Sequence, residues 1–83
     1  MNDYAQELGK VLKSFDTTRM RGFIAKHKEM LDEEAVYYFE KYDDQFVLGA
    51  MAKMIMCRTD MSVKDRNIAM TILDKMGWDY EIN

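Results

Sequence analysis

The segment Phe46–Cys57 reads FVLGAMAKMIMC, and ten of its twelve residues are apolar. Gly49 and Lys53 are the two exceptions, and no proline interrupts the run. A helix that is apolar on every side must be covered on every side. A run of this length is too short to cross a bilayer and is typical of a helix buried in a protein core. We therefore expect the rest of the chain to wrap around this segment.

The composition predicts a small all-α protein. The chain has 83 residues, of which 48% are hydrophobic and 33% are charged, a balance typical of folded globular proteins. It contains no proline and only four glycines, as expected of helices joined by short loops. We expect a single helical domain over residues 1–83, built as a compact bundle of about four to five short helices around the central apolar helix.

Two amphipathic helices are predicted before residue 31. The first covers about Asp3–Ser14, and its apolar stripe comprises Tyr4, Leu8, Val11, Leu12 and Phe15. Gly9 lies inside this helix, where it weakens the helix but allows a close contact with another one. The second helix begins at Asp16 or Thr17, both good N-caps, and has no clear stop signal before it ends near residues 28–31.

Residues 33–57 are predicted to form either one long helix or two. Asp32, followed by Glu33 and Glu34, is a strong start signal, because acids favour the positive end of the helix dipole. We favour a break at Asp43-Asp44, with one of these residues capping a separate helix over residues 45–58. An unbroken helix would be about 38 Å long, which exceeds what so small a domain covers. The core-facing stripe of this region is predicted to be Ala35, Phe39, Tyr42, Phe46, Ala50, Met54 and Cys57.

The last helix is predicted from its two ends. Ser62 and Asp65 form a capping pattern at its start, after a loop at residues 58–61. Gly77 is the expected left-handed residue at its end, and Trp78 should fold back onto Leu73 or Ile72, as in a Schellman motif. The buried stripe is expected to be Ile68, Ala69, Ile72, Leu73 and Met76. Residues 78–82 alternate between apolar and polar, which favours a short extended C-terminal tail.

Catalysis and metal binding have little support in the sequence. His27 is the one histidine and Cys57 the one cysteine, so the two together cannot build a typical zinc site. A catalytic His27 would need a nucleophile and an orienting group, and its spacing from Phe23 and Ile24 instead favours a half-buried structural role. No glycine-rich phosphate loop is present. We expect a non-enzymatic protein without a cofactor.

A protein interface is the preferred functional interpretation. Nine methionines are unusual in a chain this short, and flexible methionine surfaces suit adaptable binding. If short helices leave part of the central helix uncovered, the exposed candidates are Met51, Ile55 and Met56, which lie off the core-facing stripe. Tyr37 and Tyr38 are further candidates, because they flank the buried Phe39 beside acidic residues.

The alternative class is a DNA-binding regulator. Residues 1–30 carry a net charge of +2, whereas residues 31–60 carry −4, and the whole chain carries −3. Six basic side chains would contact the nucleic acid: Lys10, Lys13, Arg19, Arg21, Lys26 and Lys28. The acidic total and the acidic segment that follows make this alternative the weaker one.

The sequence therefore predicts a small cytosolic protein-interaction module that docks on a protein partner or forms a homodimer. A single cysteine and the lack of a secretory signal pattern favour the cytosol, and no membrane span is expected. Adaptor, inhibitor and mobile-element accessory protein are roles that the sequence does not separate.

Overall fold

The protein is a bundle of five α-helices and one short 3₁₀ turn, as the computed structural model shows for residues 3–78. The elements are α1 (Asp3–Ser14), α2 (Thr17–Lys26), the 3₁₀ turn η1 (Lys28–Met30), α3 (Glu33–Lys41), α4 (Asp44–Met56) and α5 (Val63–Met76). The predicted all-α bundle is thus confirmed. The predicted extended tail falls at residues 78–82, which lie outside the described part except for Trp78.

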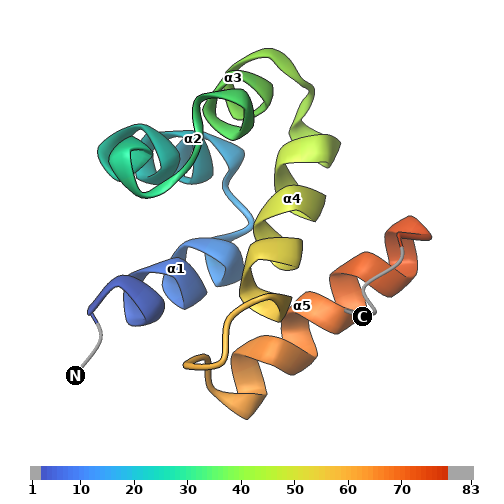
Figure 1. Ribbon diagram of the computed structural model, residues 1–83. Helices are drawn as coiled ribbons and strands as arrows, with labels where there is room; N and C mark the ends of the chain where they lie inside the picture. The colour runs from blue at the N-terminus through green and yellow to red at the C-terminus, as the bar shows by residue number, and fades with distance from the viewer. Residues whose placement is uncertain (1–2, 79–83) are drawn as a thin grey trace.

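The apolar helix α4 is central, as predicted. Figure 1 shows it running through the middle of the bundle, with α1 and α2 on one side, α3 at its beginning and α5 along its end. It packs against each of the other four α-helices. The core draws side chains from all five, including Leu8, Met20, Phe39, Val47 and Leu73. The radius of gyration of the Cα atoms is 11.8 Å.

The predicted break between two helices is confirmed, and it falls at residues 42–43, one position before the expected Asp43-Asp44. Asp43 is the N-cap of α4, and its carboxylate accepts a hydrogen bond of 2.9 Å from the backbone N–H of Phe46. Asp16 caps α2 in the same way, since its side chain accepts from the backbone N–H groups of Thr18 and Arg19. Helix α2 ends at Lys26, and η1 continues the chain from there, so the soft boundary expected near residues 28–31 is a 3₁₀ turn.

Gly9 permits a close contact between α1 and α5. A methyl group added at Gly9 would lie 2.2 Å from Asp65 Oδ2, so the carboxylate occupies the space that a side chain would need. Asp65 is buried, and its Oδ1 lies 3.0 Å from Lys13 Nζ, within ion-pair distance but without a well-aligned hydrogen bond. Ser62 caps α5 as predicted, with its hydroxyl accepting from the backbone N–H of Asp65.

The C-terminal end of α5 closes as a Schellman motif, and Trp78 then leaves its own helix. Gly77 has a φ of 73°, and its N–H and that of Trp78 donate to the carbonyl groups of Asp74 and Leu73. The indole ring lies over α4, where a methyl group added at Gly49 would be 2.7 Å from Trp78 Cη2. The backbone prediction is thus confirmed, but the ring packs against α4 through Gly49, which sequence reasoning missed.

The predicted orientation of α4 is wrong. Phe46, Ala50 and Met54 are half-buried and Cys57 is exposed, although they were expected to face the core. The face covered by the neighbouring helices is the one that includes Val47, Met51, Ala52 and Ile55. A helix with apolar side chains in every direction has no periodicity that indicates its buried face. The break at residues 42–43 also prevents the stripe of α3 from continuing into α4.

Among the described residues, no helix is both long enough and apolar enough to cross a membrane.

Candidate functional site

Five aromatic side chains from three parts of the chain form a continuous strip of rings. We call this set the aromatic strip: Tyr37, Tyr38, Tyr42, Phe46 and Trp78. The ring centroids of Tyr37 and Tyr38 are 5.8 Å apart, and those of Tyr38 and Tyr42 are 5.0 Å apart and stacked. Phe46 follows at 4.5 Å from Tyr42, edge to face, and Trp78 follows at 5.7 Å from Phe46. These distances are typical of favourable aromatic pairs.

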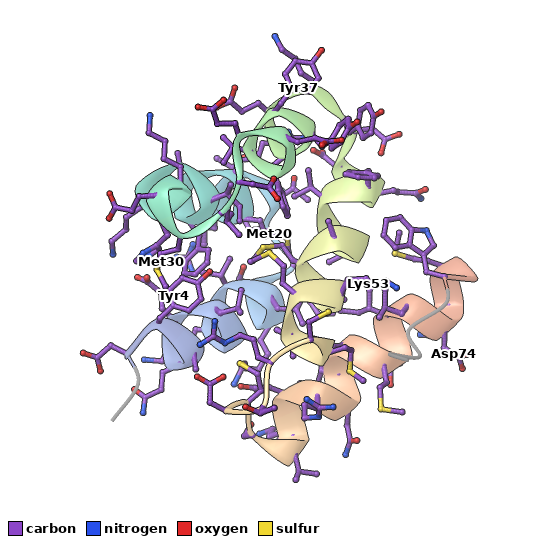
Figure 2. The ribbon with its side chains drawn as sticks, viewed as in Figure 1. Tyr4, Met20, Met30, Tyr37, Lys53 and Asp74 are labelled. Atoms are coloured by element: carbon purple, nitrogen blue, oxygen red, sulfur yellow. The ribbon has the colours of Figure 1, made fainter. Side chains whose placement is uncertain are left out.

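Much of the aromatic strip faces solvent. Tyr37 is 55% exposed and Tyr42 is 45% exposed, whereas Tyr38, Phe46 and Trp78 are half-buried. Figure 2 shows Tyr37 pointing away from the bundle on α3, while Met20 lies in the interior beside α4. Large rings that pack against each other and still face water form a contiguous apolar surface, which is a typical property of interaction sites.

The segment that carries the tyrosines of the strip is acidic. Residues 33–46 contain five acids and one lysine, which gives a net charge of −4. The Tyr38 hydroxyl donates a hydrogen bond of 3.1 Å to Glu34 Oε1, and this bond raises the pKa of Tyr38 because it favours the protonated phenol. Glu33, Glu40 and Asp43 are exposed. The tyrosines of the strip therefore belong to a segment of net negative charge, and one of its acids contacts Tyr38.

Arg21 of α2 holds the corner between α3 and α4, on which the strip is built. Its guanidinium donates to the backbone carbonyl of Phe39 and, over 2.8 Å, to that of Tyr42. It also pairs with the Asp44 carboxylate at 3.0 Å. The hydrogen bond from Arg21, followed by one from Thr17, lowers the pKa of Asp44. One side chain thus binds the C-terminal end of α3 and the first turn of α4 together.

The structure places the five predicted interface residues in two different environments. Tyr37 and Tyr38 lie in the aromatic strip. Met51, Ile55 and Met56 are only 0%, 0% and 8% exposed, so their expected exposure on an uncovered face of α4 is wrong. The surrounding helices cover this face of the monomer, because α1, α2 and α5 all pack against α4.

Sequence reasoning missed Tyr42, Phe46 and Trp78 as members of the strip. Tyr42 and Phe46 were expected on the buried stripe, and Trp78 on α5. The four-residue spacing of Tyr38 and Tyr42 was a usable signal, because residues at this spacing share one side of a helix. The break at residues 42–43 places Phe46 on a separate helix, so its contact with Tyr42 had no such signal. The sequence did not indicate which side faced solvent.

Three of the six basic residues of the DNA-binding alternative are engaged within the protein. Lys13 pairs with Asp65, Lys26 Nζ lies 3.0 Å from Glu7 Oε2, and Arg21 holds the α3–α4 corner. The remaining three are exposed and form no ion pair with the described acids: Lys10, Arg19 and Lys28.

His27 has a structural environment. Its Nε2 lies 2.9 Å from Glu7 Oε1, and its ring packs against those of Tyr4 and Phe23 at 5.0 and 4.7 Å. The hydrogen bonds from His27 and then Lys26 lower the pKa of Glu7. Among the described contacts of His27, none is to a serine or a cysteine. The described residues also contain no group of three potential ligands placed to hold a metal ion.

The fold and this strip define a small helical bundle with an exposed aromatic surface. No family model, no curated protein and no solved structure matches the chain. What the chain does must therefore be inferred from its own side chains.

Proposed function

We propose that the chain is a cytosolic, non-enzymatic interaction module that binds a basic segment of a protein partner on the aromatic strip. The observation that carries this proposal is the strip itself, in which exposed and half-buried rings contact each other in series and the tyrosines belong to an acidic segment. Tyrosine and tryptophan are enriched among the residues that dominate binding energy at protein interfaces.

The charge distribution determines the chemistry of the partner. Residues 33–46 carry a net charge of −4, and although Asp44 is paired with Arg21, the other four acids of this segment attract a partner segment rich in arginine or lysine and speed its association. Arginine fits best, because its guanidinium both pairs with carboxylates and stacks on aromatic faces. The partner segment therefore carries arginine next to apolar side chains.

The geometry also supports tight binding because little ordering is required. The rings already contact each other, and Arg21 holds the two helices that carry most of them. A preformed surface loses less conformational entropy on binding than a flexible one.

Titration with two designed peptides tests the proposal. Both peptides have about 15 residues and the same amphipathic pattern of leucines, and they carry either arginine or glutamate at every polar position. Trp78 is the one tryptophan of the chain and lies in the strip, so its fluorescence reports binding there. The arginine peptide should shift this emission and move the amide resonances of Tyr42 and Phe46. Its affinity for the strip should exceed that of the glutamate peptide by about tenfold or more.

Two variants complete the design. Tyr42→Ala removes the ring between Tyr38 and Phe46 and should weaken binding of the arginine peptide by about tenfold. Val63→Ala is the matched control, since Val63 is 74% exposed but lies outside the strip. Equal binding of both peptides at the strip, or unchanged binding by Tyr42→Ala, contradicts the proposal.

DNA binding has less support. The ion pairs of Lys13, Arg21 and Lys26 engage half of the basic set within the protein. A DNA-binding protein should hold duplex DNA at low salt and release it steeply as salt rises. Such behaviour, lost when Lys10 and Lys28 are replaced by glutamine, would favour this alternative over the protein partner.

A further inference from the structure

A second apolar surface lies between the C-terminal end of α1 and α5. It is a groove of about 440 Å³ whose apolar lining comes from Phe15, Ile68 and Ile72. Asn67 and Thr71 line it as well, and Lys13 and Lys75 provide its charges. The groove shares no residue with the aromatic strip.

Phe15 has an unusual backbone conformation for its residue type. Its φ is 53°, in the left-handed region, where glycine or asparagine normally ends a helix. A bulky residue is strained in this region. The side chain is also 59% exposed, although the sequence placed it on the buried stripe of α1. The exposed side chain therefore gains little from burial in the monomer, so the fold alone gives no reason for a phenylalanine at this position.

The charges of the groove select its occupant. Its lining contains two lysines and no acid. Lys13 is partly neutralised by Asp65, whereas Lys75 is exposed and forms no ion pair with the described acids. An apolar groove open to solvent, with a lysine beside it, suits an amphipathic helix that inserts apolar side chains and carries acids along its flank.

We propose that this groove binds an acidic amphipathic helix of a partner protein, with Phe15 as the aromatic contact and Lys75 as the charge contact. The aromatic strip takes a segment of the opposite charge. A chain with both surfaces joins two partners of opposite charge, so the groove extends the proposed function from a binding module to an adaptor. The groove proposal does not require the strip proposal to hold.

The glutamate peptide described above is the probe for the groove, with the arginine peptide as its charge-reversed control. Nuclear magnetic resonance titration should show the glutamate peptide moving the amide resonances of Ile68 and Thr71. The arginine peptide should bind there at least about tenfold more weakly. Decanoate, a small molecule with an apolar chain and one carboxylate, is titrated in parallel. The proposal is overturned if both peptides bind the groove equally, or if decanoate occupies it and neither peptide does.

Phe15→Gly separates binding from folding. Glycine adopts the left-handed conformation without strain, so the melting temperature should stay the same or rise. Affinity for the glutamate peptide should fall by about tenfold because the aromatic contact is lost. Unchanged affinity would overturn the proposal, and so would a lowered melting temperature, since Phe15 would then be required by the fold.

Two further variants distinguish this site from the strip. Lys75→Gln should weaken the glutamate peptide by a few-fold without changing binding of the arginine peptide. Tyr42→Ala should leave the glutamate peptide unaffected. If Tyr42→Ala weakens both peptides equally, the two bind at one surface and the groove proposal fails.

Discussion

Helices α3 and α4 are adjacent in the chain and both rich in apolar residues, yet they differ in how much of them is buried. In α4, six residues are buried: Val47, Gly49, Met51, Ala52, Ile55 and Met56. In α3, Phe39 is the buried member of the core among the side chains described, and the tyrosines face solvent. The buried residues of α4 are thus mainly aliphatic and methionine, whereas in α3 the ring of Phe39 is buried and that of Tyr37 is exposed. The difference shows that hydrophobicity alone does not determine which of two neighbouring helices is buried.

The largest expected effect comes from a charge placed in α4. Met51 is fully buried, so Met51→Lys introduces an ammonium with no partner, and this substitution should unfold the chain. Met51→Ala should lower the free energy of unfolding by about 2–5 kcal/mol. Circular dichroism during urea unfolding measures both. Met54→Lys is the control, because Met54 is only half-buried and a lysine there reaches water. A folded Met51→Lys protein would break the assignment of this face of α4 to the core.

The next largest effect on the free energy of unfolding is expected from alanine substitutions at two closely packed glycines. A Cβ at Gly9 would lie 2.2 Å from Asp65 Oδ2, and one at Gly49 would lie 2.7 Å from Trp78 Cη2. Gly9→Ala and Gly49→Ala should therefore destabilise the protein by about 1–3 kcal/mol, despite the better helix propensity of alanine. Gly49→Ala should in addition change the emission of Trp78.

Gly22 provides the matched control for both substitutions. It lies within α2, and nothing is within 4 Å of the position a Cβ would take. Gly22→Ala should stabilise the protein by about 0.5–1 kcal/mol through helix propensity alone. If all three substitutions change the unfolding free energy in the same direction, the close contacts at Gly9 and Gly49 do not exist.

A smaller effect is expected in α3. Tyr37 is 55% exposed and its ring contacts only Tyr38 among the described rings, so Tyr37→Ala should change the free energy of unfolding by less than about 0.5 kcal/mol. The same substitution should weaken the arginine peptide. Stability is measured by urea unfolding and affinity by Trp78 fluorescence. A strongly destabilised Tyr37→Ala protein would remove the contrast between α3 and α4.

The smallest expected effect is a pH dependence of the stability that the Arg21–Asp44 contact gives to the α3–α4 corner. Because the Arg21 guanidinium lowers the pKa of Asp44 in the folded protein, the contact stabilises the fold above the ordinary pKa of an aspartate. This stabilisation is lost as the pH falls through about 4 and below. The difference in melting temperature between the wild type and Asp44→Asn should therefore be present at neutral pH and disappear in acid.

The control for this prediction is Asp74→Asn, because Asp74 is an exposed acid of α5 with no described ion pair. Its difference in melting temperature from the wild type should not follow this pH trend. A difference that persists unchanged at low pH would contradict the role of the Arg21–Asp44 pair.

The helices were largely predictable because their ends carry local signals. Asp43 and Ser62 are good caps, and Gly77 is a typical left-handed terminus, so the break before α4 and both ends of α5 followed from the sequence. The 3₁₀ turn after α2 had no such signal. The left-handed residue after α1 was not predictable either, because it is Phe15 and phenylalanine rarely adopts a positive φ.

The candidate site was only half predictable. Tyr37 and Tyr38 were identified from their position beside a buried residue and a group of acids. The continuation through Phe46 to Trp78 depends on contacts between residues 32 positions apart, which no local pattern encodes. The buried face of α4 depends likewise on which helices pack against it, because its own sequence is apolar all round.

Phe39 is the one buried core side chain described in α3, and this has a consequence for the cooperativity of unfolding. Detaching α3 exposes little apolar surface, so its cost should depend only slightly on denaturant and add little heat capacity. Amide hydrogen exchange in α3 should then occur by local opening, whereas amides in α4 exchange when the whole bundle unfolds. A partner bound across Tyr37 on α3 and Phe46 on α4, as proposed above, would bind only the closed arrangement. Its binding would therefore bring α3 into the same cooperative unit as the core.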